Sequence, residues 1–121
     1  MSDREEIQNT IQTYFDCMYE SDGGKAHDAF HPAAKITGYT QEGLQQMSVD
    51  DFAKFVASKS PSHKENGDPV LLETLSLDIA GETAVARVRD AYIGLTFLDT
   101  LSFLKVDNRW VIYNKLFHVE S

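Results

Sequence analysis

An acidic residue lies in the middle of an apolar segment near the C-terminal end. Its carboxyl group is the first candidate in this sequence for a role in ligand binding or acid–base catalysis. Asp99 lies within TFLDTLSFLKV, residues 96–106, among leucines and phenylalanines. A buried carboxylate is costly unless it is paired, hydrogen-bonded or neutralised. Three roles are therefore open to Asp99: completing a hydrogen-bond network in the core, orienting a ligand, or acting as a general base.

The turn after this segment determines which residues accompany Asp99. Asp107 and Asn108 tolerate the left-handed backbone conformation, so they suit a two-residue turn between antiparallel strands. In that register Asn114 and His118 lie diagonal to Asp99, within reach of a hydrogen bond, and a one-residue slip would separate them. Alternation then places on one face, predicted to be the interior, Phe97, Asp99, Leu101, Phe103, Trp110, Ile112, Asn114, Leu116 and His118.

A second carboxylate is predicted on the same face. In TAVARVRDAY, residues 83–92, turning the alanines inward directs Asp90 and Tyr92 inward as well and leaves Arg87 and Arg89 facing water. A bulge at Gly94 would shift this register.

The opposite face of these strands carries an unusual amount of apolar surface. Its predicted apolar members are Leu98, Leu104, Val111, Tyr113 and Phe117. Such a patch is larger than a monomer usually exposes, so a homodimer through this outer face is expected. The alternative is that Thr100, Ser102 and Lys115 on the same face make it adequately polar.

A binding function requires the fewest assumptions. In this interpretation aromatic and inward-facing residues enclose a small apolar or aromatic molecule, and the polar ones orient it. The candidate ligand-binding residues are Tyr14, Phe15, Met18, Phe52, Phe55, Asp90, Tyr92, Phe97, Trp110, Asn114 and His118.

The first alternative is a cofactor-independent proton-transfer enzyme of the isomerase, dehydratase or cyclase type. Asp99 would be the catalytic base, His31 or His118 the acid, and Tyr14 or Tyr92 a hydrogen-bond donor to a substrate oxygen. The second alternative is a structural or interaction protein whose aromatic residues simply fill the core. A metal site is not expected.

The rest of the chain provides the elements that position these residues. A capping box at Ser2 and Glu5 begins a helix that reaches the glycines at 23 and 24, and a shorter helix follows and ends at His31-Pro32. Residues 34–40 and LQQM predict a hairpin, and Ser48 caps a third helix. A polar loop over 58–69 precedes four β-rich segments. The prediction is an α+β fold with helices on one face of a curved antiparallel or mixed sheet.

Composition limits the class of partner. The 121 residues suit one domain, and a net charge of −8 disfavours nucleic acid and anionic membrane surfaces. Cys17 is the only cysteine, and neither a signal peptide nor a nucleotide-binding motif is present. A cytoplasmic protein without a cofactor is expected.

Three stretches of the chain resemble a known family: FHPAAKITG, the helix after MSVDDF, and FLDTLSFLKVDNRWVIYNKLFH. They are similar to the nuclear transport factor 2-like superfamily and, within it, to the group named "putative lumazine-binding", with SnoaL-like relatives. The resemblance implies a cone-shaped sheet wrapped around a long first helix, a pocket between them and a dimer through the sheet. The chain has Asp107-Asn108 and Thr100 where such sequences often have Asp-Gly and Tyr. The superfamily includes isomerases, dehydratases, cyclases, binders and inactive proteins, so it does not define one function.

Overall fold

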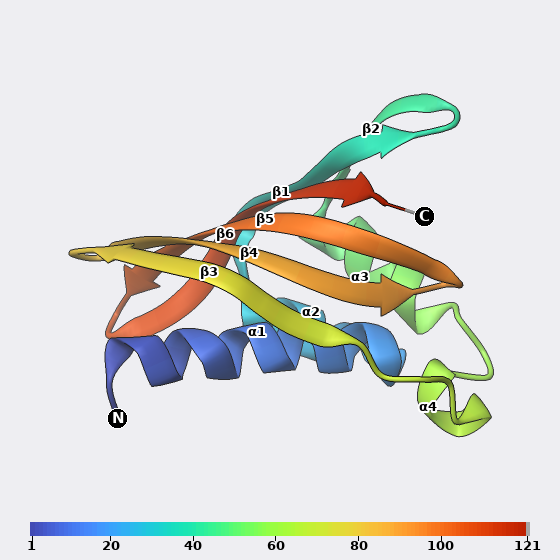
Figure 1. Ribbon diagram of the computed structural model, residues 1–121, viewed down its shortest axis with the longest axis horizontal. Helices are drawn as coiled ribbons and strands as arrows, with labels where there is room; N and C mark the ends of the chain where they lie inside the picture. Colours follow the sequence, from blue (N-terminus) through green and yellow to red (C-terminus); the bar gives the residue numbers. More distant parts are fainter. Residues whose placement is uncertain (121) are drawn as a thin grey trace.

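A six-stranded sheet curves over a long amphipathic helix (Figure 1). The computed structural model describes residues 1–120. The elements follow one another as α1 (Asp3–Tyr19), α2 (Gly23–Ala29), β1 (Phe30–Thr40), β2 (Gly43–Ser48), α3 (Val49–Ala57), α4 (His63–Asn66), β3 (Leu72–Ala80), β4 (Thr83–Tyr92), β5 (Leu95–Val106) and β6 (Arg109–Val119). The predicted α+β class is confirmed.

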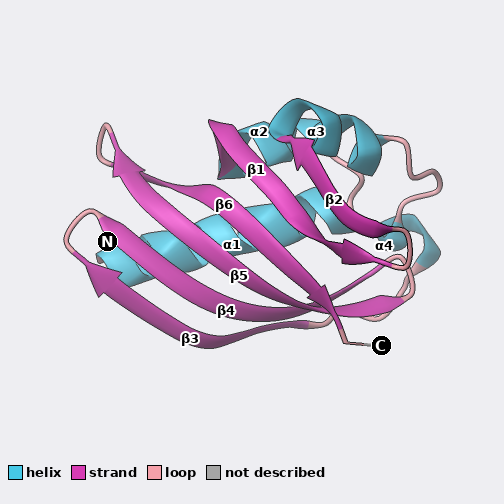
Figure 2. Ribbon diagram, turned by 90° about the horizontal axis from the view of Figure 1, so that it is seen from above, coloured by secondary structure: helices cyan, strands magenta, loops and turns pink. Residues whose placement is uncertain are grey.

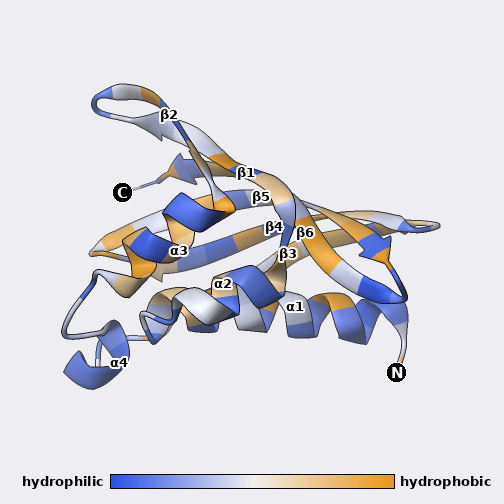
Figure 3. Ribbon diagram, turned by 180° about the vertical axis from the view of Figure 1, so that it is seen from behind, coloured by the Kyte–Doolittle hydropathy of each residue, from blue (hydrophilic) through white to orange (hydrophobic). Residues whose placement is uncertain are grey.

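The first helix forms where the capping pattern predicts it. The Glu5 backbone N–H donates to Ser2 Oγ at 3.1 Å, and the Ser2 backbone N–H donates to the Glu5 carboxylate at 3.3 Å. One side of α1 is buried against the sheet, whereas hydrophilic residues dominate the side that faces away (Figure 3). The burial of this apolar stripe fixes α1 inside the curve of the sheet.

The strand order is β2-β1-β6-β5-β4-β3, so the first strand of the chain lies beside the last. Strands β1 and β6 run parallel, and the other neighbours are antiparallel. Figure 2 shows α1 crossing beneath the strands, with α2 and α3 beside it. At Gly38, which pairs with Phe117, a Cβ atom would lie 2.5 Å from the Phe117 carbonyl oxygen. The close approach of β1 to β6 therefore requires glycine at this position.

The predicted turn between β5 and β6 is confirmed, but the predicted register is correct only near the turn. Asp107 and Asn108 both have positive φ, and Phe103 pairs with Ile112. The register then shifts, so that Asp99 pairs with Phe117 and not with Leu116.

The cause of this shift is a bulge, because Tyr113 has no partner on β5. One extra residue turns the rest of a strand over. The predicted faces of the second half of β6 are therefore wrong. Lys115 and Phe117 lie on the inner side, whereas Asn114, Leu116 and His118 lie on the outer side.

Strand β4 has the predicted orientation. Its inner positions are buried, including Asp90 and Tyr92, and its arginines face outward. Gly94 does not host a bulge. It forms a tight turn with Ile93, both with positive φ, and the β4–β5 register is uninterrupted.

Other boundaries differ from the prediction. The LQQM segment is confirmed as the return strand β2, but β1 begins earlier than expected, at Phe30, directly after α2. The segment predicted to be a polar loop contains α4, which Ser62 and Glu65 begin with a second capping box. Within residues 1–120, the apolar helical runs are too short to cross a membrane.

Candidate functional site

A pocket of about 680 Å³ opens where the β1–β2 hairpin, α3 and the β4–β5 turn meet. Most of its lining side chains are apolar or aromatic. They are Ile36, Tyr39, Thr40, Gln41, Glu42, Gln45, Met47, Phe52, Phe55, Tyr92, Ile93, Leu95, Phe97, Lys115, Phe117 and Val119. No residue of α1 is among them, so the predicted location between the first helix and the sheet is wrong. The helix fills that space with core side chains.

Lys115 is the buried charge of the pocket. Its side chain is 6% exposed, and its Nζ lies 4.8 Å from the centroid of the Tyr14 ring and 4.9 Å from that of Phe52. Phe117 provides a third aromatic ring, at 5.8 Å. Within residues 1–120, this ammonium group has neither a hydrogen-bond acceptor nor an ion-pair partner. Its contacts are with aromatic faces, which attract cations.

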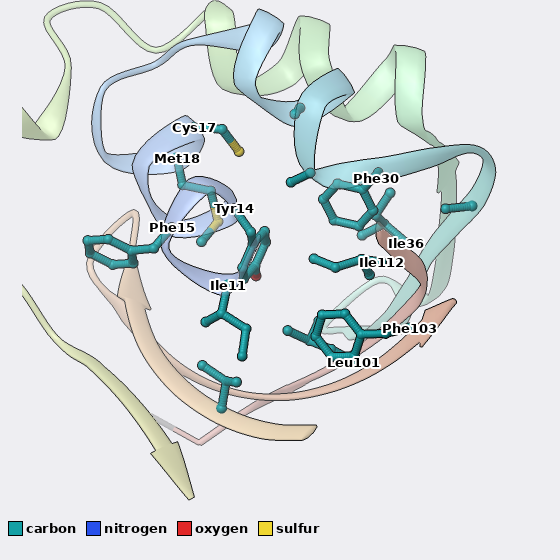
Figure 4. Packing of buried hydrophobic residues seen from close by; sticks show 14 of the residues in the cluster. Ile11, Tyr14, Phe15, Cys17, Met18, Phe30, Ile36, Leu101, Phe103 and Ile112 are labelled. Carbon is teal, nitrogen blue, oxygen red and sulfur yellow. The ribbon is translucent and has the colours of Figure 1, made fainter. Parts of the chain in front are cut away.

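A hydrogen bond deeper in the core joins α1 to β5. The Tyr14 hydroxyl donates to Asp99 Oδ2 at 2.6 Å, and both residues are fully buried. Figure 4 shows Tyr14 projecting from α1 into the core between helix and sheet. Burial, and then the nearby carboxylates of Asp90 and Asp99, raise the pKa of Tyr14 well above its usual value, so its hydroxyl remains a donor. The inward position predicted for Asp99 is confirmed.

Asp90 lies on the same inner face and is 1% exposed. Neither of its oxygens accepts a hydrogen bond from the described residues, and Oδ1 of Asp99 also lacks a donor. Burial, together with the neighbouring Asp99 carboxylate, raises the pKa of Asp90 to about 9. A protonated Asp90 can donate a hydrogen bond, whereas an ionised carboxylate only accepts. Asp90 is therefore the neutral member of this pair of carboxyl groups near neutral pH.

Four of the predicted ligand-binding residues line the pocket: Phe52, Phe55, Tyr92 and Phe97. The Tyr92 ring lies 6.4 Å from the ring of Phe55 and 5.2 Å from that of His63. Its hydroxyl is buried without a partner in the described residues, and burial raises its pKa. Tyr92 is thus an unused polar group in the pocket wall.

The other predicted site residues lie elsewhere. Side chains of the core include Tyr14, Phe15, Met18, Asp90 and Trp110. Trp110 belongs to the packing near the start of α1, where its Nε1 donates to Asp3 Oδ1 at 3.0 Å.

Three predicted residues are outside this arrangement. Asn114 and His118 face outward, so the predicted contact of Asp99 with them is wrong, and the bulge is the physical reason. His31 accepts a hydrogen bond at Nδ1 from the Ala33 backbone N–H at 3.0 Å, and its ring packs near Tyr113. It does not line the pocket.

Sequence reasoning missed Lys115 and Phe117, as well as the contribution of the β1–β2 hairpin through Tyr39 and Met47. Regular alternation of side chains along the strand predicted that Lys115 and Phe117 face outward. The segment YNKLF contains no glycine or other residue that signals a bulge, so the inward position of these two side chains could be seen only from the pairing with neighbouring strands.

The protonation of Asp90 predicts a pH-dependent stability. The unfolded chain releases this proton above about pH 4, whereas the folded chain keeps it until about pH 9. Raising the pH through this window therefore favours unfolding, by up to about 1.4 kcal/mol per pH unit for one proton. Asn does not titrate, so the Asp90→Asn variant should not lose stability through this proton. The difference in free energy of unfolding, variant minus wild type, should therefore increase as the pH rises. Urea denaturation at several pH values from 5 to about 8.5 would measure it.

Asp78→Asn, which changes an exposed carboxylate on β3, is the matched control and should follow the wild-type pH profile. Identical slopes for the wild type and Asp90→Asn would contradict a proton held at Asp90.

Comparisons with known proteins agree with this fold. Residues 2–118 match the family model described as "Putative lumazine-binding". An NTF2-like protein of unknown function from Silicibacter pomeroyi superimposes with a TM-score of 0.85 at 21% identity, over 99% of this chain and 100% of that chain. Another, from Methylobacillus flagellatus, gives a TM-score of 0.85 at 28% identity, over 98% of this chain and 93% of the other.

A curated relative carries an enzyme name. The protein named aldolase FrzH, from Cladobotryum sp, is 22% identical over 122 residues, which cover 97% of this chain and 91% of that protein. The family model spans nearly the whole chain, and the solved structures share its helix and curved sheet. The chain therefore belongs to the "putative lumazine-binding" family of the NTF2-like superfamily.

Proposed function

We propose that this protein binds a small apolar or aromatic molecule in the pocket described above. The pocket lies between the β1–β2 hairpin, α3, the β4–β5 turn and the C-terminal part of β6. The observation that carries the proposal is the pocket itself, whose volume of about 680 Å³ suits a ligand of two or three fused rings. The description of the matching family supports small-molecule binding, and the pocket chemistry does not single out a pteridine.

The lining favours a flat ligand. Phe52 and Phe55 come from α3, and Phe97 and Phe117 come from β5 and β6, so aromatic groups reach the pocket from both sides. Aromatic side chains bind ring systems through offset or edge contacts in addition to buried area. Lys115 and the unpartnered hydroxyl of Tyr92 supply polar contacts that can orient such a ligand.

Blocking the pocket should abolish binding. Leu95 lines the pocket at the start of β5, and Leu95→Trp would fill part of it. Thermal-shift measurements with lumazine, lumichrome and naphthalene derivatives are expected to find a compound that raises the Tm of the wild type by about 10 °C at a hundredfold excess over its Kd. The same compound should have little effect on Leu95→Trp.

Leu75→Trp is the control, because Leu75 is also partly exposed on a strand but does not line the pocket. Absence of any stabilising compound in the wild type, or equal stabilisation of Leu95→Trp, would contradict the proposal.

A second candidate function is proton transfer at a carbon next to a carbonyl group. It is favoured by the buried carboxyl groups of Asp90 and Asp99, which have oxygens without hydrogen-bond partners in the described residues, and by the relative named as an aldolase, since aldol chemistry begins with removal of such a proton. Asp99 would be the base, and Tyr14 would fix its orientation. Neither carboxyl group lines the pocket, which is why binding is the first proposal.

This candidate predicts isotope exchange. The wild type would exchange the methyl protons of acetylnaphthalene for deuterium, as followed by NMR, and Asp99→Asn would slow the exchange by about 100-fold or more. Asp78→Asn should retain the wild-type rate. An unchanged rate in Asp99→Asn would exclude Asp99 as the base.

We also propose that a second copy of the chain covers the outer face of the sheet. Val85, Tyr113 and Leu116 are 41%, 36% and 55% exposed there, and Leu98 and Leu104 are half-buried between them. An apolar surface of this kind is typical of an interface. Phe117 is missing from this face and Leu116 takes part in it, so the patch differs from the predicted one.

Leu116→Glu tests the dimer. A charge at the centre of the face should shift the protein from dimer to monomer in light scattering, because the buried carboxylate would lack a partner. Val70→Glu changes an exposed apolar residue outside the sheet and should leave the mass unchanged. A monomeric wild type would contradict the proposal.

A further inference from the structure

Lys115 restricts the chemical class of the ligand. We propose that the pocket takes an anion, in which a flat apolar body fills the aromatic walls and a carboxylate or an ionised enol oxygen contacts the Nζ of Lys115. This inference rests on the proposed binding function and goes beyond it, because the lining of the pocket alone would accept a neutral molecule equally well.

The first support is the unused hydrogen-bonding capacity of Lys115. An ammonium group has three N–H donors, and within residues 1–120 none of the three donates to the protein. Lys115 as a whole is 6% exposed and lines the pocket, so the pocket is where its N–H donors can meet an acceptor other than the protein. The aromatic rings of Tyr14, Phe52 and Phe117 attract the positive charge of Lys115, but they do not replace an oxygen acceptor for its N–H groups.

The second support is that no carboxylate of the protein occupies the place of the anion. Asp99 accepts a hydrogen bond from the Tyr14 hydroxyl at 2.6 Å. Its oxygens do not form an ion pair with Lys115 within residues 1–120, although Lys115 faces Leu101 two positions further along β5. Asp90 keeps its proton near neutral pH, so it does not supply a negative charge to Lys115. The N–H donors of Lys115 are therefore left free for a ligand.

The third support is the distribution of charge along the pocket. The lining contains one basic residue, Lys115, and one acidic residue, Glu42. Glu42 is exposed at the tip of the β1–β2 hairpin. Solvent and salt screen an exposed charge far more than a buried one. The net charge of −8 also repels anions at long range, so a preference for anions has to come from direct contact with Lys115.

A pair of probes of almost equal shape tests this inference. Naphthoate carries a carboxylate and naphthamide a neutral amide on the same ring system. Calorimetric titration of the wild type is expected to give a Kd for naphthoate that is lower by about 10- to 100-fold, the range expected for one charge-assisted hydrogen bond. Lys115→Met should lose this preference and bind naphthamide as tightly as the wild type does.

Lys59→Met is the matched control. Lys59 also places its Nζ over an aromatic ring of the pocket, 4.4 Å from the centroid of Phe55, but it does not line the pocket. This variant should keep the wild-type preference for naphthoate. Lys115→Gln provides a second variant that retains polarity, in case the methionine variant does not fold, and it should also lose most of the preference.

The outcomes separate the two proposals. Naphthamide binding as tightly as naphthoate in the wild type would overturn the anion inference and leave the binding function intact. A preference for naphthoate that persists in both Lys115 variants would overturn the role of Lys115. If neither probe binds the wild type, the anion inference is overturned, and the thermal-shift screen decides the proposed binding function separately.

Discussion

In β6 the backbone passes Tyr113 without pairing it to β5, and the remainder of the strand depends on this extra residue. Beyond it, Lys115 and Phe117 face the interior, and Asn114 and Leu116 face outward. The C-terminal half of β6 thereby supplies the pocket with the ammonium group of Lys115 and the aromatic ring of Phe117. The parallel pairing of β1 with β6 relies on the same arrangement, because Gly38 leaves room for the backbone and ring of Phe117.

Tyr14 contacts two of the buried polar groups. Its hydroxyl donates to Asp99 at 2.6 Å, and the Nζ of Lys115 lies 4.8 Å from the centroid of its ring. Asp90 has no such donor, and burial together with the neighbouring Asp99 raises its pKa to about 9. An ionised Asp90 at this depth would be costly, because neither of its oxygens has a hydrogen-bond donor among the described residues. The core is consequently more stable when Asp90 is protonated than when it is ionised.

These features explain why membership of the family does not by itself define an activity. The fold provides a helix inside a curved sheet, and similar structures of unknown function share it. Activity would depend on the few polar groups that reach the pocket. Here the buried ones are the Lys115 ammonium group and the Tyr92 hydroxyl, other polar side chains come from the β1–β2 hairpin, and neither Asp90 nor Asp99 lines the pocket. Neither carboxyl group is therefore placed to contact a molecule in this pocket directly.

The local features of the protein could be predicted from residues that lie close together in the sequence. Capping residues begin α1 and α3, alternation orients β4, and Asp107-Asn108 makes the tight turn, because each depends on neighbours within a few residues. The inward position of Asp99 followed from the same alternation. Tertiary structure alone decided the bulge at Tyr113, the parallel pairing of β1 with β6 and the place of the hairpin over the pocket. A bulge relieves strain in a curved sheet and is fixed by strands distant in sequence, so alternation along β6 could not reveal that Lys115 faces inward.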